Sequence, residues 1–195
     1  MRPYRAAGGG LCLLLAILFA APAAALDFLY LVRHAEKSDG WPQDRELDAF
    51  WPLSPGGQVR AEFLASRLEN SNIAAIYTSR TTRTLMTGLP LANRVRIPIS
   101  ANDDSIAADK MESFVSFVRG KHPADKAVLI VGHSNTIPLL LMRLGANPDC
   151  YGKLGIVKKG EGGDQRFLIE GHEGLWKADL KKQGCEALSQ EGLAR

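Results

Sequence analysis

Long hydrophobic runs are scarce in this 195-residue chain, and the clearest of them lies at the start. LCLLLAILFA (11–20) follows a basic MRPYRAAGGG and precedes APAAA, in which Ala23 and Ala25 form an A-x-A cleavage pattern. A membrane span needs about 20 apolar residues, so this run is too short. We therefore expect residues 1–25 to be a signal peptide cleaved after Ala25, with an uncleaved anchor as the alternative. The mature protein would be periplasmic or secreted, with no stable membrane anchor.

An excess of charge of one sign is also absent. The formal net charge is +3, and without Arg2 and Arg5 the chain has 22 basic against 21 acidic residues. This balance excludes the basic footprint of a nucleic-acid-binding protein. Hydrophobic residues make up 46% and charged residues 23%, which is typical of a packed globular protein. With no internal repeat or low-complexity linker, residues 26–195 are expected to form one domain.

Cysteines and metal ligands are few. Without the first 25 residues only Cys150 and Cys185 remain, and in an oxidising compartment we expect them to form a disulfide. Two separate thiols are the alternative. The sequence has no His/Asp/Glu cluster with the spacing of metal ligands, so we expect no metal site.

What the sequence does contain is an alternation of strand-like and helix-like segments. Ser54 and Pro55 are typical of a helix start, Val59, Phe63, Leu64 and Leu68 would share one helical face, and Pro90 should end the next helix. The expected strands are 27–33, 73–79, 95–100 and 127–133, and the expected helices 53–70, 80–94, 108–122 and 134–146. Such alternation predicts an α/β fold, a three-layer α/β/α sandwich with a mostly parallel central sheet. Three short strands at 153–159, 165–171 and 174–181 should add edge or antiparallel strands.

Between the first strand and the first helix lies a long loop, residues 37–52, with Trp41 and Trp51. Long loops in compact domains are often functional. The two tryptophans are expected either to line a substrate entrance or to plug the core.

Cationic side chains follow three of the expected strands. Arg33 and His34 end the first, Arg80 and Arg83 follow the second in TSRTTR, and His133 follows a later one in GHSN. Because the carboxyl ends of parallel strands meet at one edge of a sheet, these groups should converge. Together with a helix N-terminus they would suit a phosphate.

These motifs carry a resemblance. LVRHAEK (31–37), LSPGGQVRA (53–61), YTSRTTRT (77–84) and VGHSNT (131–136) resemble the histidine phosphatase superfamily, in its order and spacing, over about residues 28–145. The chain looks most like the small, phosphoglycerate mutase-like members of branch one, among them exported ones. The resemblance implies that His34 is a nucleophile that forms a phosphohistidine. It also implies that Arg33 and Arg83 bind phosphoryl oxygens, that His133 stabilises the transition state, and that no metal or other cofactor is needed.

One part departs from the family pattern. Phosphoglycerate-mutase-like members carry a glutamate, the acid for the leaving group, after the third strand, whereas this stretch reads SANDDSIAAD (100–109). Asp103, Asp104 and Asp109 are the candidates there. Without a positioned acid, we expect a preference for substrates with good leaving groups, such as phosphohistidine, acyl phosphates or aryl phosphates.

The resulting hypothesis is an exported phosphatase for phosphomonoesters or phosphoramidates, acting on small or cell-envelope phosphorylated substrates. A mutase is disfavoured because export would separate it from cytosolic phosphoglycerates. The alternative from another class is a non-catalytic phospho-ligand-binding protein of the same fold. His122 and His172 are expected to be turn residues, and Arg80 either solvated or in contact with substrate.

Overall fold

The computed structural model describes residues 26–40, 47–161 and 165–193, so the expected signal peptide and Trp41 lie outside the described residues. A six-stranded sheet has the order β3-β2-β4-β1-β7-β8, and β5 and β6 form a separate two-stranded sheet. The strands are β1 (Phe28–Arg33), β2 (Ile73–Thr78), β3 (Ile99–Ala101), β4 (Ala127–Gly132), β5 (Ile156–Lys159), β6 (Arg166–Ile169), β7 (Gly174–Asp179) and β8 (Leu188–Gly192). Strands β1 to β4 are parallel, and β7 pairs antiparallel with both β1 and β8.

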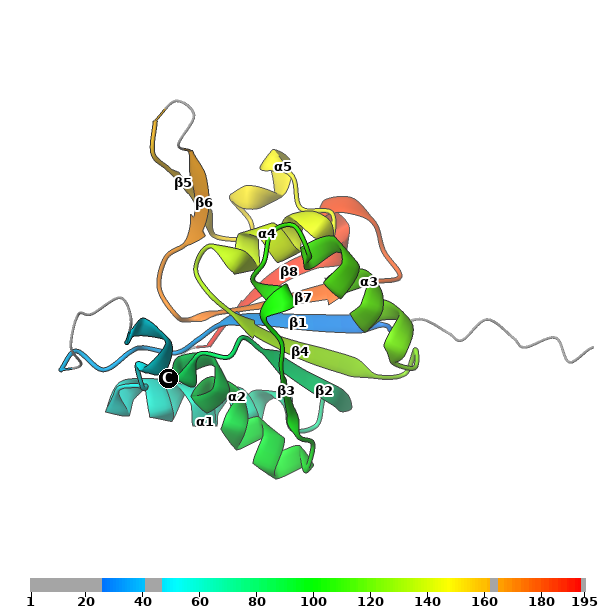
Figure 1. The fold of residues 1–195 in the computed structure, drawn as a ribbon. Coiled ribbons are helices and arrows are strands. Elements are labelled where there is room, and N and C mark those ends of the chain that lie inside the picture. The colour runs from blue at the N-terminus through cyan, green and yellow to red at the C-terminus, as the bar shows by residue number, and fades with distance from the viewer. Residues whose placement is uncertain (1–25, 41–46, 162–164, 194–195) are drawn as a thin grey trace, which may run out of the picture.

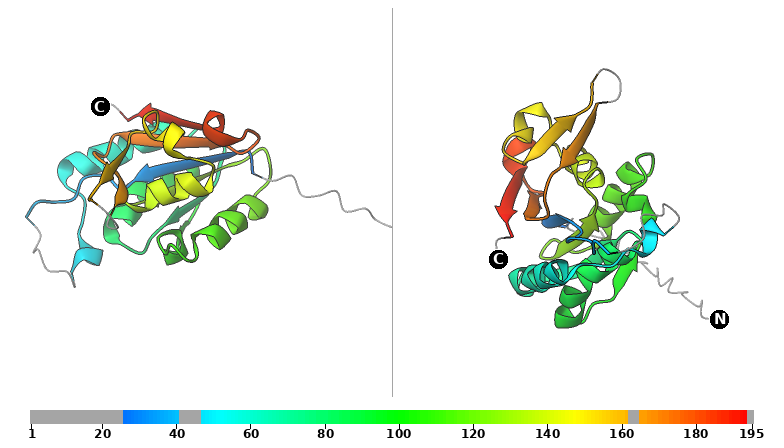
Figure 2. Two further views of the ribbon diagram at one scale, coloured as in Figure 1. Left: turned by 90° about the horizontal axis from the view of Figure 1, so that it is seen from above. Right: turned by 90° about the vertical axis from the view of Figure 1, so that its left-hand side faces the viewer.

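Helices cover both faces of the sheet, which confirms the predicted three-layer α/β/α class (Figures 1 and 2). The α-helices are α1 (Pro55–Leu68), α2 (Thr82–Val95), α3 (Met111–Lys121), α4 (Thr136–Arg143) and α5 (Pro148–Tyr151). Short 3-10 helices are η1 (Asp48–Phe50), η2 (Asp103–Ser105) and η4 (Gly184–Ala187). One core lies under α1 and α2, and a second under α3 and α4. Within the described residues no helix is long and apolar enough to span a membrane.

Helix α1 begins where the sequence predicts, but its buried face differs. Ser54 caps the helix by accepting a hydrogen bond from the Gly57 backbone N–H at 3.0 Å, and Pro55 is the first helical residue. Val59 and Phe63, expected in the core, are 59% and 39% exposed. Leu64 and Leu68 are buried as expected, and the rest of the buried face is formed by Gly57, Arg60, Ala61 and Ala65. The helix approaches the Glu36 backbone so closely that a side chain at Gly57 would collide with it.

Helix α2 does not end at Pro90, which corrects a second expectation. It continues to Val95, with Leu91 and Ala92 buried in the core. An interior proline costs about 3 kcal/mol through its missing N–H and its steric clash. Burial of the apolar turn after Pro90, against the sheet and α1, offsets this cost.

The C-terminal third is built on the central sheet and on a projecting hairpin. Strand β7 joins the sheet antiparallel to β1, as expected, whereas β5 and β6 stand away from it (Figure 1). A disulfide joins Cys150 to Cys185, in agreement with the predicted pairing. The hairpin returns to the sheet at Ile169, whose N–H donates to the Ser134 carbonyl at 2.9 Å. This bond brings the β6–β7 turn to the carboxyl end of β4.

Candidate active site

The three motifs meet at one edge of the sheet because their strands are aligned. In the parallel pairing Arg33 of β1 lies opposite Gly132 of β4, and Thr78 of β2 lies opposite Val131. The backbone N–H of His34 continues this ladder by donating to the Gly132 carbonyl at 2.9 Å. A cavity of about 450 Å³ opens at this edge. Its lining includes Arg33, His34, Lys37, Asp48, Arg83 and His133.

His34 is held as a neutral imidazole of defined tautomer. Its Nδ1 lies 2.8 Å from the Ala35 carbonyl oxygen, which can only accept, so Nδ1 carries the proton and Nε2 keeps a lone pair. The residue is 4% exposed, and burial is the main cause that lowers its pKa to about 2. An unprotonated nitrogen in a site of cationic groups is the state that a nucleophile toward phosphorus requires.

His133 follows β4, the neighbour of β1 on the side away from β7. The two ring centroids are 5.3 Å apart, close enough for one phosphoryl group to touch both rings. The Ser79 hydroxyl contacts His133 Nε2 at 2.9 Å, and Thr136 Oγ1 accepts from the His133 backbone N–H at 2.9 Å. Gly132 allows this, since a side chain there would press on the first turn of α4. Burial is the largest cause that lowers the pKa of His133 to about 4.

Two arginines, Arg83 buried and Arg33 partly buried, supply positive charge. Arg83 is 7% exposed and donates to the Asp48 backbone oxygen at 2.5 Å and to Asp48 Oδ2 at 2.9 Å. Arg33 donates to the carbonyls of Ile169 and Gly171 at 3.2 and 2.8 Å, and burial is the main cause that lowers its pKa. Among the described residues, the Nε atoms of both arginines are buried without a hydrogen-bond partner. Such atoms are suited to an anionic ligand.

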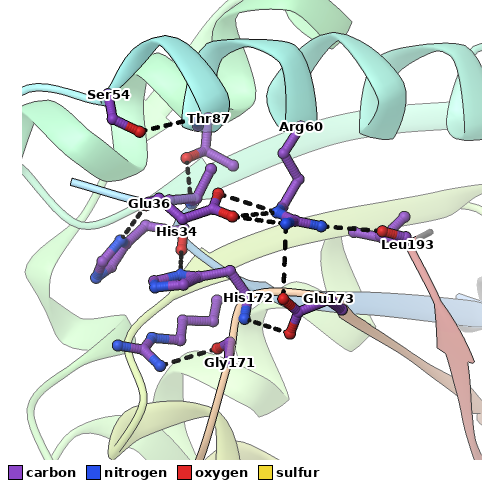
Figure 3. Close-up of polar contacts among 12 residues, drawn as sticks. His34, Glu36, Ser54, Arg60, Thr87, Gly171, His172, Glu173 and Leu193 are labelled. Atoms are coloured by element: carbon purple, nitrogen blue, oxygen red, sulfur yellow. Dashed lines mark hydrogen bonds and ion pairs between the residues drawn. The ribbon is translucent and has the colours of Figure 1, made fainter. Parts of the chain in front are cut away.

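The β6–β7 turn contributes a third histidine that the sequence did not indicate. His172 lies in this turn, as expected, but its Nδ1 also donates to the His34 carbonyl at 2.6 Å and its ring lies 5.5 Å from that of His34, contacts that the sequence did not predict. Figure 3 shows the His34 and His172 rings side by side at the end of β1. Burial is the main cause that lowers the pKa of His172. His122, in contrast, lies apart from the site, where it contacts the Tyr77 hydroxyl.

A charge network centred on Arg60 supports this turn. Arg60 donates three hydrogen bonds to the Glu36 carboxylate, one to the Leu193 carbonyl at 3.0 Å, and pairs with Glu173 at 3.6 Å (Figure 3). Hydrogen bonding from Arg60 is the main cause that lowers the pKa of Glu36 to about 2. The network connects α1 to the residue two positions after His34, to the β6–β7 turn and to the end of β8.

The aspartates after β3 do not line the cavity. Asp103 accepts from the Arg80 backbone N–H at 2.9 Å and pairs with its side chain, Asp104 pairs with Lys110, and Asp109 is exposed. Arg80 is 74% exposed in its side chain, which favours the solvated alternative. Of the acids in the part of the chain that the structure describes, the one that lines the cavity is Asp48, from the long loop.

Trp51 is a core residue of that loop. It is 8% exposed and donates from its indole to the Ser38 carbonyl at 2.6 Å, and the Lys37 ammonium lies 3.6 Å from its ring centroid. Of the two alternatives for this tryptophan, the structure shows the plug. No group of three potential metal ligands occurs in the described ranges.

Comparisons with known proteins identify a family and a shared fold. The family model of the histidine phosphatase superfamily (branch 1) matches residues 29–106, which include Arg33, His34 and Arg83 and end before His133. This match confirms the resemblance read from the motifs. No curated protein matches the sequence.

Solved structures share the fold at low identity. A protein assigned as phosphohistidine phosphatase SixA of Agrobacterium tumefaciens has a TM-score of 0.60 at 21% identity, covering 79% of this chain and 92% of its own. Its counterpart from Nakamurella multipartitia has 0.54 at 21%, covering 88% and 96%. A mycobacterial glucosyl-3-phosphoglycerate phosphatase has 0.54 at 15%, covering 85% and 96%.

Proposed function

We propose that this chain of the histidine phosphatase superfamily is a metal-independent phosphatase that hydrolyses phosphomonoesters or phosphoramidates through a phosphohistidine on His34. The family match supports phosphatase activity in general. The observation that carries the finer proposal is the state of His34. Its Nδ1 proton is committed to the Ala35 carbonyl, so Nε2 has a free lone pair beside two guanidinium groups.

In this mechanism the protein binds the phosphoryl group before it reacts. Arg33 and Arg83 would donate from their unpaired Nε atoms to phosphoryl oxygens, and His133 would donate as charge develops on them. Nε2 of His34 attacks phosphorus in line and the leaving oxygen departs. Water then attacks the phosphohistidine and releases phosphate, which restores the neutral imidazole.

The experiment is a panel of phosphomonoesters and a phosphoramidate, assayed with purified mature protein in the presence of a chelator. We expect turnover by the wild type and its loss in His34→Ala, by about 10³-fold or more. Turnover that depends on added metal would contradict metal independence. If the chain is instead a non-catalytic phospho-ligand-binding protein, the wild type and His34→Ala should both bind phosphate, and neither should hydrolyse any substrate.

Export is the second part of the proposal. The Cys150–Cys185 disulfide supports it, because disulfides persist in oxidising compartments such as the periplasm. Small or cell-envelope phosphorylated compounds would then be the substrates. Fractionation of cells that express the full chain should find a processed protein beginning at Leu26, and retention of residues 1–25 on a cytosolic form would contradict the proposal.

A further inference from the structure

The cavity contains a carboxylate that neither the motifs nor the family match assigns. Of the described residues that line it, Asp48 is the acid, and it shares the cavity with His34, Arg83 and His133. It comes from η1 in the loop between β1 and α1. Its side chain is 45% exposed, so water can reach it.

Two other described acids near the site, Glu36 and Glu173, are paired with Arg60. Glu36 accepts three hydrogen bonds from Arg60, and Glu173 accepts from the His172 backbone N–H and pairs with Arg60. The aspartates of 103–109 lie outside the cavity lining, as described above. Asp48 is therefore the described carboxylate best placed to meet a phosphoryl group.

We propose that Asp48 is the acid that protonates the leaving oxygen and the base that activates the hydrolytic water. This proposal rests on the proposed function, since it needs a phosphoryl group bound at His34. It also revises the expectation that the enzyme favours good leaving groups, because that expectation assumed that no positioned acid was present.

Two cationic side chains hold Asp48 at the cavity. In the free protein its carboxylate contacts Arg83 at 2.9 Å and Lys37 at 3.6 Å. A phosphoryl dianion that binds Arg83 would compete for the same guanidinium and lie against the carboxylate. Two anions in contact disfavour each other's charged form, so the proposal requires that Asp48 carries the proton in the reactive complex.

The two steps balance. The His34 Nε2 lone pair forms a bond to phosphorus, the bond from phosphorus to the leaving oxygen breaks, and the Asp48 proton goes to that oxygen. Water then attacks phosphorus and gives a proton to the Asp48 carboxylate. The P–N bond breaks, its electron pair returns to His34, and inorganic phosphate leaves.

The test compares Asp48→Asn with wild type over a series of substrates from p-nitrophenyl phosphate through phenyl phosphate to glycerol phosphate. The asparagine amide oxygen can still accept a hydrogen bond from Arg83, but the amide group has no acidic proton to transfer. We expect kcat/KM for p-nitrophenyl phosphate to change less than about 5-fold, since nitrophenolate needs no acid. For glycerol phosphate we expect a loss of about 10²–10⁴-fold. Phosphate should also accumulate on His34, because the base for the second step is gone.

Three further variants make the outcome decisive. Asp103→Asn, which removes an acid outside the cavity, should match wild type on every substrate, and Asp48→Glu should recover part of the loss. An equal loss on all substrates by Asp48→Asn, or a gain on all of them, would overturn the proposal and leave Asp48 as an orienting or blocking group. If Lys37→Gln, and not Asp48→Asn, lost kcat/KM in a leaving-group-dependent way, the proposal would be overturned and the Lys37 ammonium would be the acid. Absence of any turnover by wild type would overturn the proposed function itself, and this inference with it.

Discussion

Arg60 offers the sharpest test of how the site is held together. The residue is 6% exposed, and its guanidinium connects the Glu36 carboxylate, the Leu193 carbonyl and Glu173. Removal of one partner of a buried ion pair costs about 3–5 kcal/mol, because the remaining charge is left uncompensated. The Glu36 side chain is 27% exposed, so water can partly replace the arginine. We therefore expect Arg60→Ala to lower the free energy of unfolding by about 3 kcal/mol.

The assay is urea unfolding followed by circular dichroism, together with thermal melting. A loss of about 3 kcal/mol corresponds to a fall in Tm of about 6–12 °C for a domain of this size. Arg67→Ala is the matched control, since Arg67 lies on the same helix but pairs with Glu191 at 54% side-chain exposure. An exposed pair is worth about 0–1 kcal/mol. Equal effects of the two substitutions would refute the reasoning.

The same pair predicts a pH dependence of stability. Glu36 has a folded-state pKa of about 2, below its ordinary value of 4.5, so it binds protons more readily when the protein is unfolded. Its contribution is present above pH 4.5 and is lost as the pH falls toward 2. The difference in stability between wild type and Arg60→Ala should narrow over this range, and a constant difference would contradict the assignment.

The remaining predictions concern the nucleophile, the β6–β7 turn and the disulfide. Because the pKa of His34 is about 2, its ring signals should not titrate in NMR spectra between about pH 5 and 8. A midpoint near the ordinary histidine value would contradict a neutral nucleophile. Gly171 has φ +71° and a side chain there would collide with the adjacent carboxylate, so Gly171→Ala should raise KM several-fold. Gly120→Ala, in open space on α3, should leave KM unchanged, and equal KM values for both variants would count against a role for the turn. The double variant Cys150→Ser/Cys185→Ser should lose about 3 kcal/mol in urea unfolding, and an unchanged midpoint would show that the bridge adds nothing.

The parts of the fold that the sequence predicts are those set by local chemistry. The six residues of β4 are all buried and apolar or small, and Ser54 and Pro55 mark the start of α1. The failures come from packing between distant segments. The buried face of α1 depends on the close approach of Gly57 to the Glu36 backbone. The spacing of apolar residues along the helix gives no sign of this contact. Pro90 stays inside α2 because the turn after it is buried.

The candidate site likewise contains some residues that short motifs predict and others that they do not. Arg33, His34 and Arg83 are recognisable because they lie in short motifs at strand and helix ends, and the sheet order brings His133 beside them. His172 was missed because it meets His34 across 138 positions of sequence, in a turn with no motif of its own. A signal for Asp48 was present in the length of the 37–52 loop, but nothing local distinguishes it from the other aspartates.

The central claim is that a phosphoryl group passes through His34, and trapping this intermediate tests it most directly. Protein mixed with a ³²P-labelled substrate is quenched in alkali within milliseconds, digested and mapped. We predict label on the peptide that contains His34, stable to base and lost in acid, at up to one phosphoryl group per chain. Rapid turnover with no such label, or unchanged turnover in His34→Ala, would contradict the account.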